Sequence, residues 1–380
     1  MNLDPRPDLS IVMPCLNEED SVAECVAEAL EGIKRCNLVG EVLIIDNGST
    51  DKSREIAEKA GARVIREDVR GYGAACVRGL NEARGEWVIM GDADGTYDFA
   101  EFAVLSQGLK DEADFVMGNR LTSSMEAGAM PPLHRYVGTP LITRLLGIFS
   151  GVHVKDSQCG LRAIRKDVLP GLGLRATGME FASEMLLKAG QADLRIAEVP
   201  ITYRRRTGDS KLNTLRDGWR HVRFLLVNSP SIVMVIPGIL LVVLGLISLG
   251  ITVSQGDGVS IGSLRWQPVF AGTILLVAGT NALLLGTVGE MMALAQGSNR
   301  KMPLVDFYRK HVGFDRLFGG ALLLIAVGLG ADGYIFVRWT ADSSANELLR
   351  LAVAGQTALI VGANLAFGSV AIALADQLDQ

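Results

Sequence analysis

Residues 87–98 read Trp-Val-Ile-Met-Gly-Asp-Ala-Asp-Gly-Thr-Tyr-Asp, so a short apolar run leads directly into two carboxylates two residues apart. The run Trp87–Met90 predicts a buried strand of a parallel sheet. Open α/β sheets bind their ligands at the carboxyl ends of the strands, and Asp92 and Asp94 would lie there. They would then hold a hard divalent cation, which in turn would hold a diphosphate. A surface turn is the alternative, because Asp and Gly favour turns in any protein.

The residues before this stretch alternate between apolar runs and helix-like segments. The apolar runs are 9–14, 41–45 and 62–65, and the helix-like segments are 21–36, 52–60 and 73–83. Strands that alternate with helices of this length predict a parallel sheet with right-handed connections. The first part of the chain is therefore predicted to be an α/β domain.

The composition differs between the two parts of the chain. Charged residues crowd about the first 225 positions and long apolar runs fill the last 150 or so, although the formal net charge of the 380 residues is only −5. A nucleic-acid-binding protein typically has a strongly basic domain, so this pattern excludes a nucleic-acid partner. The five cysteines show no C-x-x-C spacing and predict neither a disulfide framework nor a zinc site. Residues 1–8 form a tail without an apolar segment, and we expect no cleavable signal peptide.

Several motifs, taken in order, resemble those of a known family. Residues 10–14 (Ser-Ile-Val-Met-Pro) with 17–19 (Asn-Glu-Glu), then 45–51 (Ile-Asp-Asn-Gly-Ser-Thr-Asp) and 91–94 (Gly-Asp-Ala-Asp) resemble family-2 glycosyltransferases of GT-A fold. Residues 117–120, 156–162 and 204–211 look like the branch of dolichol-phosphate-mannose synthases and polyprenyl-phosphate glycosyltransferases. Each motif alone is weak, but their order and spacing over roughly residues 9–228 are specific. Residues 95–97 (Gly-Thr-Tyr) depart from the Leu-Gln of many mannosyl enzymes, which leaves the donor sugar open.

The resemblance implies a nucleotide-sugar pocket at the strand ends. Its expected residues are Pro14, Leu16, Glu18, Asp46, Asp92, Ala93 and Asp94. Asp46 would accept hydrogen bonds from a base or ribose, with turn chemistry at the start of the next helix as the alternative. Asp92 and Asp94 would bind Mg²⁺ or Mn²⁺, which neutralises a nucleoside-diphosphate leaving group as its charge develops.

Three residues are expected to be catalytic by the same resemblance: Asp94, Arg120 and Asp156. Arg120 ends an expected strand and could clamp a phosphate with its planar fork, whereas a surface arginine is the alternative. A phosphate monoester is already an anion at neutral pH, so a lipid-phosphate acceptor needs no strong base. We therefore expect Asp156 to orient the acceptor, or to position Gln158 or Arg162, unless it only caps its loop.

Basic residues are expected to bind the acceptor lipid phosphate at the level of the lipid headgroups. The candidates are Arg120, Arg135, Arg204, Arg206 and Lys211. A solvated face or a topology signal is the alternative for such a run. Two basic amphipathic segments, near 131–150 and 212–227, are expected at the bilayer surface, although the first suits a core helix equally well.

The last part of the chain predicts a transmembrane domain. Residues 231–253, 268–294, 318–337 and 351–374 are each long and apolar enough to cross a bilayer. Basic residues gather in loop 295–317, which predicts that the catalytic domain and both termini are cytoplasmic, at the plasma membrane if the cell is prokaryotic. Gly272, Gly279 and Gly286 recur every seven residues and would serve close packing within one chain or in a homo-oligomer.

The sequence thus predicts two domains: an α/β, GT-A (Rossmann-like) catalytic domain with a mostly parallel sheet over 9–228, and an all-α transmembrane domain of four helices over 229–380. The expected function is inverting transfer of a hexose from UDP-glucose or GDP-mannose to polyprenyl or dolichyl phosphate at the cytoplasmic membrane face. A processive polysaccharide synthase is one alternative, but its Gln-x-x-Arg-Trp motif is incomplete at Arg265-Trp266 and Arg338-Trp339. A non-catalytic membrane scaffold that binds nucleotide sugar is the other.

Overall fold

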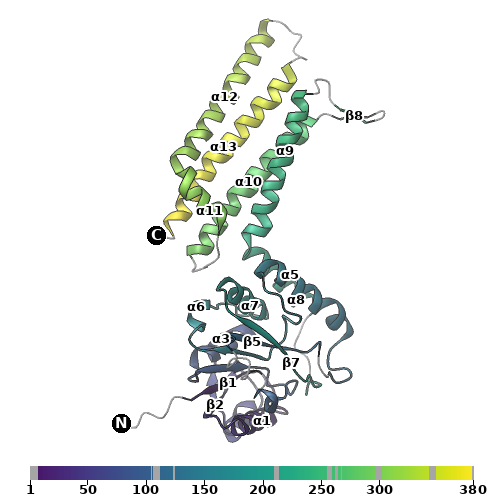
Figure 1. The fold of residues 1–380 in the computed structure, drawn as a ribbon, viewed down its shortest axis with the longest axis vertical. Helices are drawn as coiled ribbons and strands as arrows, with labels where there is room; N and C mark the ends of the chain where they lie inside the picture. Colours follow the sequence, from purple (N-terminus) through teal and green to yellow (C-terminus); the bar gives the residue numbers. More distant parts are fainter. Residues whose placement is uncertain are drawn as a thin grey trace. The chain divides into compact units, whose positions relative to one another are not determined.

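The structure is a computed structural model of the chain, and it divides into two compact units, Met1–Val227 and Asn228–Gln380 (Figure 1). The residues that the structure describes are 7–103, 105, 112–122, 125–208, 214–254, 259–261, 264–266, 268–295, 302–341 and 348–378.

The first unit is built on a seven-stranded sheet in the order β3-β2-β1-β4-β6-β5-β7. Its strands are β1 (Leu9–Cys15), β2 (Gly40–Asp46), β3 (Arg63–Arg66), β4 (Trp87–Met90), β5 (Phe115–Asn119), β6 (Arg162–Arg165) and β7 (Ile196–Pro200). Neighbouring strands are parallel except at β6, which pairs antiparallel with both β4 and β5. The prediction of a mostly parallel α/β sheet is confirmed.

The reversed strand β6 determines which loop joins the functional edge of the sheet. Its first residue, Arg162, lies opposite Met90 of β4 and Met117 of β5, the last or nearly the last residues of those strands. The residues just before β6 therefore lie beside the residues that follow β4 and β5. Alternation of strands and helices alone does not predict this reversal, which brings residues 156–161 toward Asp92 and Asp94.

Helices of the first unit pack against the strands of this sheet or against one another. They are α1 (Val22–Arg35), α2 (Ser53–Lys59), α3 (Tyr72–Glu82), α5 (Thr139–Ser150), α6 (Leu169–Leu172), α7 (Phe181–Gln191) and α8 (Thr214–Val227), with the short helical segments η1 (Phe99–Glu101) and η2 (His134–Gly138). The amphipathic α1 turns its apolar side to the core, where Val22, Cys25, Val26 and Ala29 are buried.

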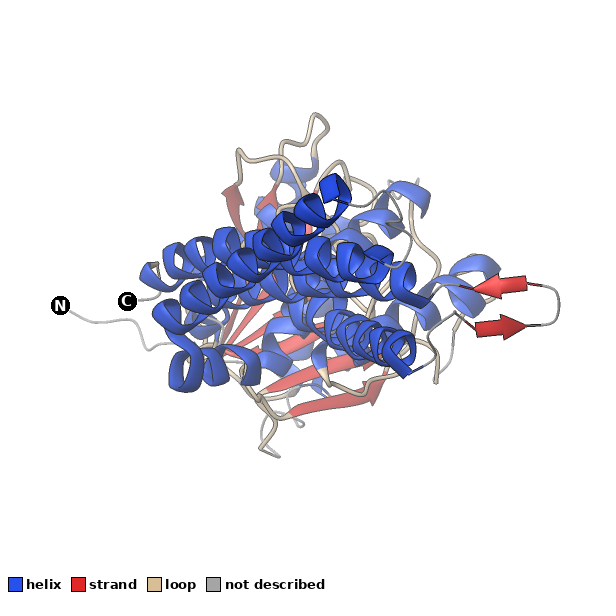
Figure 2. Ribbon diagram, turned by 90° about the horizontal axis from the view of Figure 1, so that it is seen from above, coloured by secondary structure: helices blue, strands red, loops and turns tan. Residues whose placement is uncertain are grey.

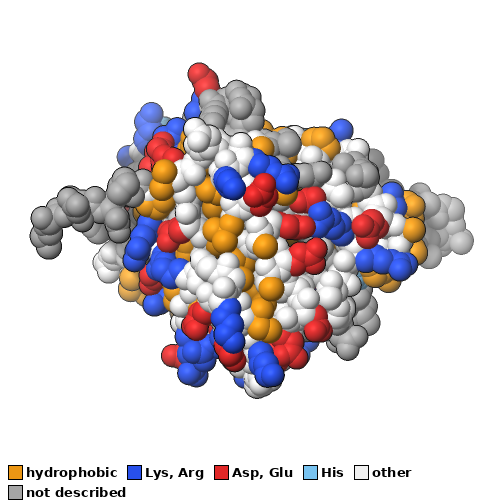
Figure 3. Space-filling view, turned by 90° about the horizontal axis from the view of Figure 1, so that it is seen from below, with side chains coloured by type: hydrophobic (Ala, Val, Ile, Leu, Met, Phe, Trp, Pro, Cys, Tyr) orange, Lys and Arg blue, Asp and Glu red, His pale blue; other side chains and the backbone are white. Residues whose placement is uncertain are grey.

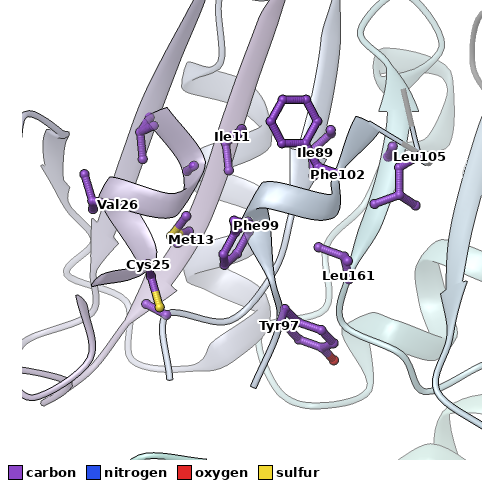
Figure 4. Packing of buried hydrophobic residues seen from close by; sticks show 14 of the residues in the cluster. Ile11, Met13, Cys25, Val26, Ile89, Tyr97, Phe99, Phe102, Leu105 and Leu161 are labelled. Atoms are coloured by element: carbon purple, nitrogen blue, oxygen red, sulfur yellow. The ribbon is translucent and has the colours of Figure 1, made fainter. Parts of the chain in front are cut away.

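Aromatic residues just after the acidic pair anchor that stretch in the core. Tyr97, Phe99 and Phe102 are at most 1% exposed and belong to the same apolar cluster as Ile11 and Met13 of β1 (Figure 4). A Cβ atom added at Gly91 would lie 2.9 Å from Cζ of Phe99, so the ring packs directly on the glycine backbone. The acidic pair is thus held between a buried strand and a buried aromatic segment.

The second unit contains four long apolar helices, as predicted. They are α9 (Ile236–Ser254), preceded by η3 (Ser231–Val235), α10 (Pro268–Ala295), α12 (Gly313–Ala341) and α13 (Leu349–Gln377). The shorter elements are β8 (Val259–Ile261), β9 (Leu264–Trp266), α11 (Pro303–Phe307) and η4 (Tyr308–Val312), and β8 pairs antiparallel with β9 (Figure 2). A helix of 29 residues such as α12 extends about 43 Å at about 1.5 Å per residue, longer than the hydrocarbon core of about 30 Å.

The glycine repeats of this unit are used for packing inside one chain. Helix α10 packs on α9 and α13, and α12 packs on α13. A Cβ atom at Gly279 would lie 2.7 Å from the backbone nitrogen of Val242 in α9, and one at Gly355 would lie 2.8 Å from Cβ of Ala331 in α12. Because these glycines permit close contacts within the chain, they give no support to the expected homo-oligomer.

Replacing Phe99 with alanine should destabilise the first unit by about 3–5 kcal/mol, since a fully buried ring would leave a cavity under the acidic stretch. The thermal unfolding of the full-length protein in detergent measures this effect. Val39→Ala is the control, because Val39 is 56% exposed and its loss should leave the first unfolding transition unchanged. Equal transitions for the two variants would contradict the anchoring role.

Candidate active site

Loops with charged side chains meet at one edge of the sheet in the first unit. Strands β1, β2, β4, β5 and β7 end at this edge, and the reversed β6 begins there. The residues at this edge are Glu18 after β1, Asp46 at the end of β2, Asp92 and Asp94 after β4, Arg120 after β5, Asp156 before β6, and Arg204 and Arg206 after β7. The edge therefore combines carboxylates with guanidinium groups.

Asp94 is buried and firmly oriented. Its Oδ1 accepts hydrogen bonds from the backbone nitrogen of Thr96 at 3.1 Å and from Oγ1 of Thr96 at 2.5 Å. Its Oδ2 lies 3.0 Å from Nη1 of Arg206. Thr96 lies in the segment 95–97, which departs from the family pattern. The Asp-x-Thr spacing is typical of a local turn between a side chain and the backbone, and this turn orients Asp94.

Asp92 has a carboxylate oxygen that could bind a cation. Its Oδ1 is buried and has no hydrogen-bond partner among the described residues, and the carboxylate of Asp94 follows two residues later. Two carboxylates that supply only oxygen atoms fit Mg²⁺ or Mn²⁺. No third His, Cys, Asp or Glu joins them into a metal-ligand group within the part of the chain that the structure describes. Oxygens of a bound diphosphate and water would complete the coordination.

The electrostatics of Asp92 agree with a site for a cation. Burial and, to a smaller extent, the charge of Asp94 raise the pKa of Asp92 to about 7, while Tyr72, Arg206 and Arg120 act in the opposite direction. A divalent cation favours the charged carboxylate and would reverse this shift.

Arg120 and Asp156 form a closed ion pair. Nε of Arg120 lies 2.7 Å from Oδ2 of Asp156, and Nη2 lies 2.9 Å from Oδ1. The backbone nitrogen of Arg120 donates to Oδ2 as well, at 3.1 Å, and Asp156 is fully buried. A carboxylate engaged in this way is poorly placed to accept a proton from an acceptor.

The expected contact of Asp156 with Arg162 is corrected by the structure. Arg162 is also fully buried, but its guanidinium donates to three backbone carbonyls, those of Ser157, Cys159 and Ala182. Asp156 accepts instead from the backbone nitrogen of Gln158, at 3.3 Å, in addition to Arg120. Arg162 thus shapes the loop, while Asp156 fixes Arg120.

The segment after β7 runs alongside the acidic stretch. The backbone nitrogen of Arg204 donates to the carbonyl of Thr96 at 2.9 Å, and that of Thr207 donates to the carbonyl of Asp94 at 3.0 Å. The side chain of Arg204 pairs with Glu28 at 2.6 Å and with Asp98. Arg204 is therefore engaged in ion pairs with this unit and holds the segment in place.

Two other expected phosphate ligands are not joined to this edge by the described contacts. Arg135, on η2, lies over the ring of Tyr136, with its Cζ 5.5 Å from the ring centroid. Lys211 lies outside the described residues. Arg120, in contrast, lies 5.2 Å from the ring centroid of Tyr203, next to Arg204.

The residues expected around the nucleotide join the same edge through loop contacts. Asp46 is 1% exposed, and its Oδ1 accepts from the backbone nitrogen of Ser49 at 3.0 Å. This contact is the turn chemistry named above as the alternative to base recognition. Pro14 is paired with Ile45 within the sheet, and the carbonyl of Ala93 accepts from Oγ of Ser21 at 2.8 Å.

Comparisons with known proteins identify the family. Residues 10–173 match the model of "Glycosyl transferase family 2", and residues 287–376 match its "C-terminal transmembrane region". The chain is 37% identical over 371 residues to the low-salt glycan biosynthesis hexosyltransferase Agl6 of Haloferax volcanii, covering 96% of this chain and 88% of the relative.

The chain belongs to glycosyltransferase family 2. It is a glycosyltransferase and an integral membrane protein with four C-terminal transmembrane helices. The predicted GT-A-like catalytic domain followed by these helices is thereby confirmed.

Other relatives match mainly the first unit. The dolichyl-phosphate hexose transferase of Haloferax volcanii is 34% identical over 212 residues, which are 56% of this chain and 89% of the relative. The dolichol-phosphate mannosyltransferase of Pyrococcus furiosus is 26% identical over 224 residues, 56% of this chain and 62% of the relative. The solved glucosyl-3-phosphoglycerate synthase of Mycobacterium tuberculosis has a TM-score of 0.46 at 23% identity, covering 58% of this chain and 79% of that one. The likeness to this solved structure extends to the fold alone.

The closed pair of Arg120 and Asp156 leads to a test of stability. Asp156→Ala should destabilise the first unit by about 3–5 kcal/mol, because it leaves the buried Arg120 without its partner. The unfolding transition of the full-length protein is the readout. Asp167→Ala serves as the control, since the Asp167 side chain is 64% exposed in its pair with Arg165. A wild-type transition for Asp156→Ala would show that the pair does not stabilise the fold.

Proposed function

We propose that this glycosyltransferase transfers a hexose from a nucleotide sugar, UDP-glucose or GDP-mannose, to polyprenyl or dolichyl phosphate. The single observation that carries the proposal is the Asp92–Asp94 pair at the carboxyl edge of the sheet, with a buried oxygen that has no partner among the described residues. Two relatives support the choice of substrates, because one is named a hexosyltransferase over nearly the whole chain and another a dolichyl-phosphate hexose transferase.

The acidic pair would serve the leaving group. Asp92 and Asp94 would hold Mg²⁺ or Mn²⁺, whose charge stabilises the departing nucleoside diphosphate. Thr96 holds Asp94 in one orientation through two hydrogen bonds, so little reorganisation is needed when the donor binds. Glu18 and Ala93, together with Pro14, Leu16 and the buried Asp46, would surround the nucleotide.

The acceptor would react without a protein base. A lipid phosphate oxygen, already negatively charged, would attack the anomeric carbon as its bond to the diphosphate breaks, which inverts the configuration. Asp156 would act on this step through Arg120, which it holds next to Tyr203. Arg120 and Arg206 would then attract the acceptor phosphate, with Arg135, Arg204 and Lys211 as further candidates.

Two helical segments of the first unit would lie at the membrane surface. Residues 133–150, which include η2 and α5, expose the apolar side chains of Leu133, Tyr136, Val137, Leu141 and Ile148. On α8, Trp219 is 62% exposed, and Arg216 and Arg223 are exposed near it. Basic and aromatic side chains on an apolar helix face suit the headgroup region of a bilayer.

The orientation follows from the basic loop between the second and third spans. Arg309, Lys310 and Arg316 lie in or just after η4, at the start of α12. The positive-inside rule would place this loop, the catalytic domain and both termini in the cytoplasm. On the face drawn in Figure 3, basic and acidic side chains are interspersed, as on an ordinary solvated surface.

The proposal is tested with the full-length protein in detergent, radiolabelled UDP-glucose or GDP-mannose, polyprenyl phosphate, and Mg²⁺ or Mn²⁺. We expect a lipid-linked hexose, and Asp92→Asn or Asp94→Asn should lower its rate by at least about a hundredfold, because the leaving group loses its metal. Asp68→Asn is the matched control, since its side chain is 82% exposed in a pair with Arg66. The absence of lipid-linked product with every donor would refute the proposed acceptor.

A further inference from the structure

The guanidinium group of Arg206 contacts Asp94, one of the two candidate metal ligands. Its Nη1 is 3.0 Å from Oδ2 of Asp94, and its Nη2 is 2.5 Å from Oε1 of Glu18. Both carboxylates are largely buried, with 8% and 10% of their side chains exposed. One arginine thus pairs with carboxylates from the loops that follow β1 and β4.

The contacts of Arg206 use only some of its hydrogen-bond donors. Its Nε is buried and has no hydrogen-bond partner among the described residues, although its two terminal nitrogens are paired. A planar guanidinium with a free donor is suited to an anion that offers several oxygen atoms, such as a phosphate. Arg206 therefore combines an ion pair to a candidate metal ligand with a donor that no group in the described part of the chain accepts.

The neighbouring arginines are held differently. Arg204 pairs with Glu28 and Asp98, which belong to α1 and to the turn before η1. Arg205 donates from Nε to the carbonyl of Ala127 at 2.8 Å. The backbone of this segment is fixed to the acidic stretch at Thr96 and Asp94, so the Arg206 side chain can change partners while its backbone stays in place.

We propose that Arg206 competes with the divalent cation for Asp94, and that metal binding releases its guanidinium to bind a phosphate. A cation that takes Oδ2 of Asp94 as a ligand weakens the contact of this oxygen with the guanidinium, because the two positive charges repel. The released arginine remains beside the site and gains a new anionic partner from the donor or the acceptor. Donor loading is thereby coupled to the appearance of a phosphate-binding group. This inference rests on the proposed metal site but not on the identity of the hexose or the lipid.

The direct test is the affinity of the full-length protein for Mn²⁺ alone, without nucleotide, measured by electron paramagnetic resonance of free Mn²⁺. Arg206→Gln should bind Mn²⁺ about tenfold more tightly than wild type, since the competing cation is gone. Arg205→Gln removes the same charge from the adjacent residue and should stay within about twofold of wild type. Arg206→Lys keeps a cation in the site and should also stay near wild type, which separates loss of charge from loss of folding.

The outcomes are distinct. Equal Mn²⁺ affinity for Arg206→Gln and Arg205→Gln, or weaker binding by Arg206→Gln, would overturn the competition. No Mn²⁺ binding by any variant would overturn it together with the Asp92–Asp94 metal site. The transfer assay reports separately on the proposed function, because it measures lipid-linked product and not metal affinity.

A second measurement uses the wild-type protein. Phenylglyoxal modifies accessible arginines, and mass spectrometry reports the modified fraction at each residue. Mn²⁺ should increase modification of Arg206 at least about threefold, because the guanidinium loses its carboxylate partner. Arg205 is the internal reference and should not change. An unchanged or lower rate at Arg206 in the presence of Mn²⁺ would contradict its release.

Discussion

Repulsion between Asp92 and Asp94 is the constraint on which the catalytic unit depends. The two side chains follow a buried strand and are held there by the aromatic residues Tyr97 and Phe99, so they cannot move apart into solvent. Burial and mutual repulsion raise the pKa of Asp92, and one of its oxygens has no partner among the described residues. Such a pair requires a cation. Arg206 supplies one from the segment after β7, and a divalent metal would supply a stronger one.

In a transfer to phosphate, both the leaving group and the acceptor are negatively charged, and different residues at this edge would stabilise each of them. In the proposed reaction, the leaving diphosphate would need positive charge at Asp92 and Asp94, while the acceptor phosphate, already an anion, would need positive charge of its own. Arg120 is fixed by three hydrogen bonds to Asp156 and lies over Tyr203, and we propose that it supplies this charge. Asp156 thus has a clear structural reason to be buried, and no proton transfer has to be assigned to it.

Local sequence patterns predict the strands, the helices and the spans, because each depends on periodicity within a short segment. The alternating runs predict the mostly parallel sheet, and the four apolar segments correspond to α9, α10, α12 and α13. Side-chain partners depend instead on loops that meet in space. Arg206 and Glu18 are 188 residues apart in sequence, and the pairing of Arg120 with Asp156 requires the reversal of β6. Asp46 differs, because its contact with Ser49 is local and corresponds to the turn chemistry that the sequence indicates as the alternative to base recognition.

The central claim is that Asp92 and Asp94 hold the metal that binds the donor diphosphate. Phosphorus-31 electron–nuclear double resonance on the full-length protein with Mn²⁺ and UDP or GDP tests it most directly, since it detects phosphates bound directly to Mn²⁺. The account predicts a strong phosphorus coupling from protein-bound Mn²⁺ in wild type and its loss in Asp92→Asn and Asp94→Asn. An unchanged coupling from protein-bound Mn²⁺ in both variants would place the metal elsewhere and contradict the account.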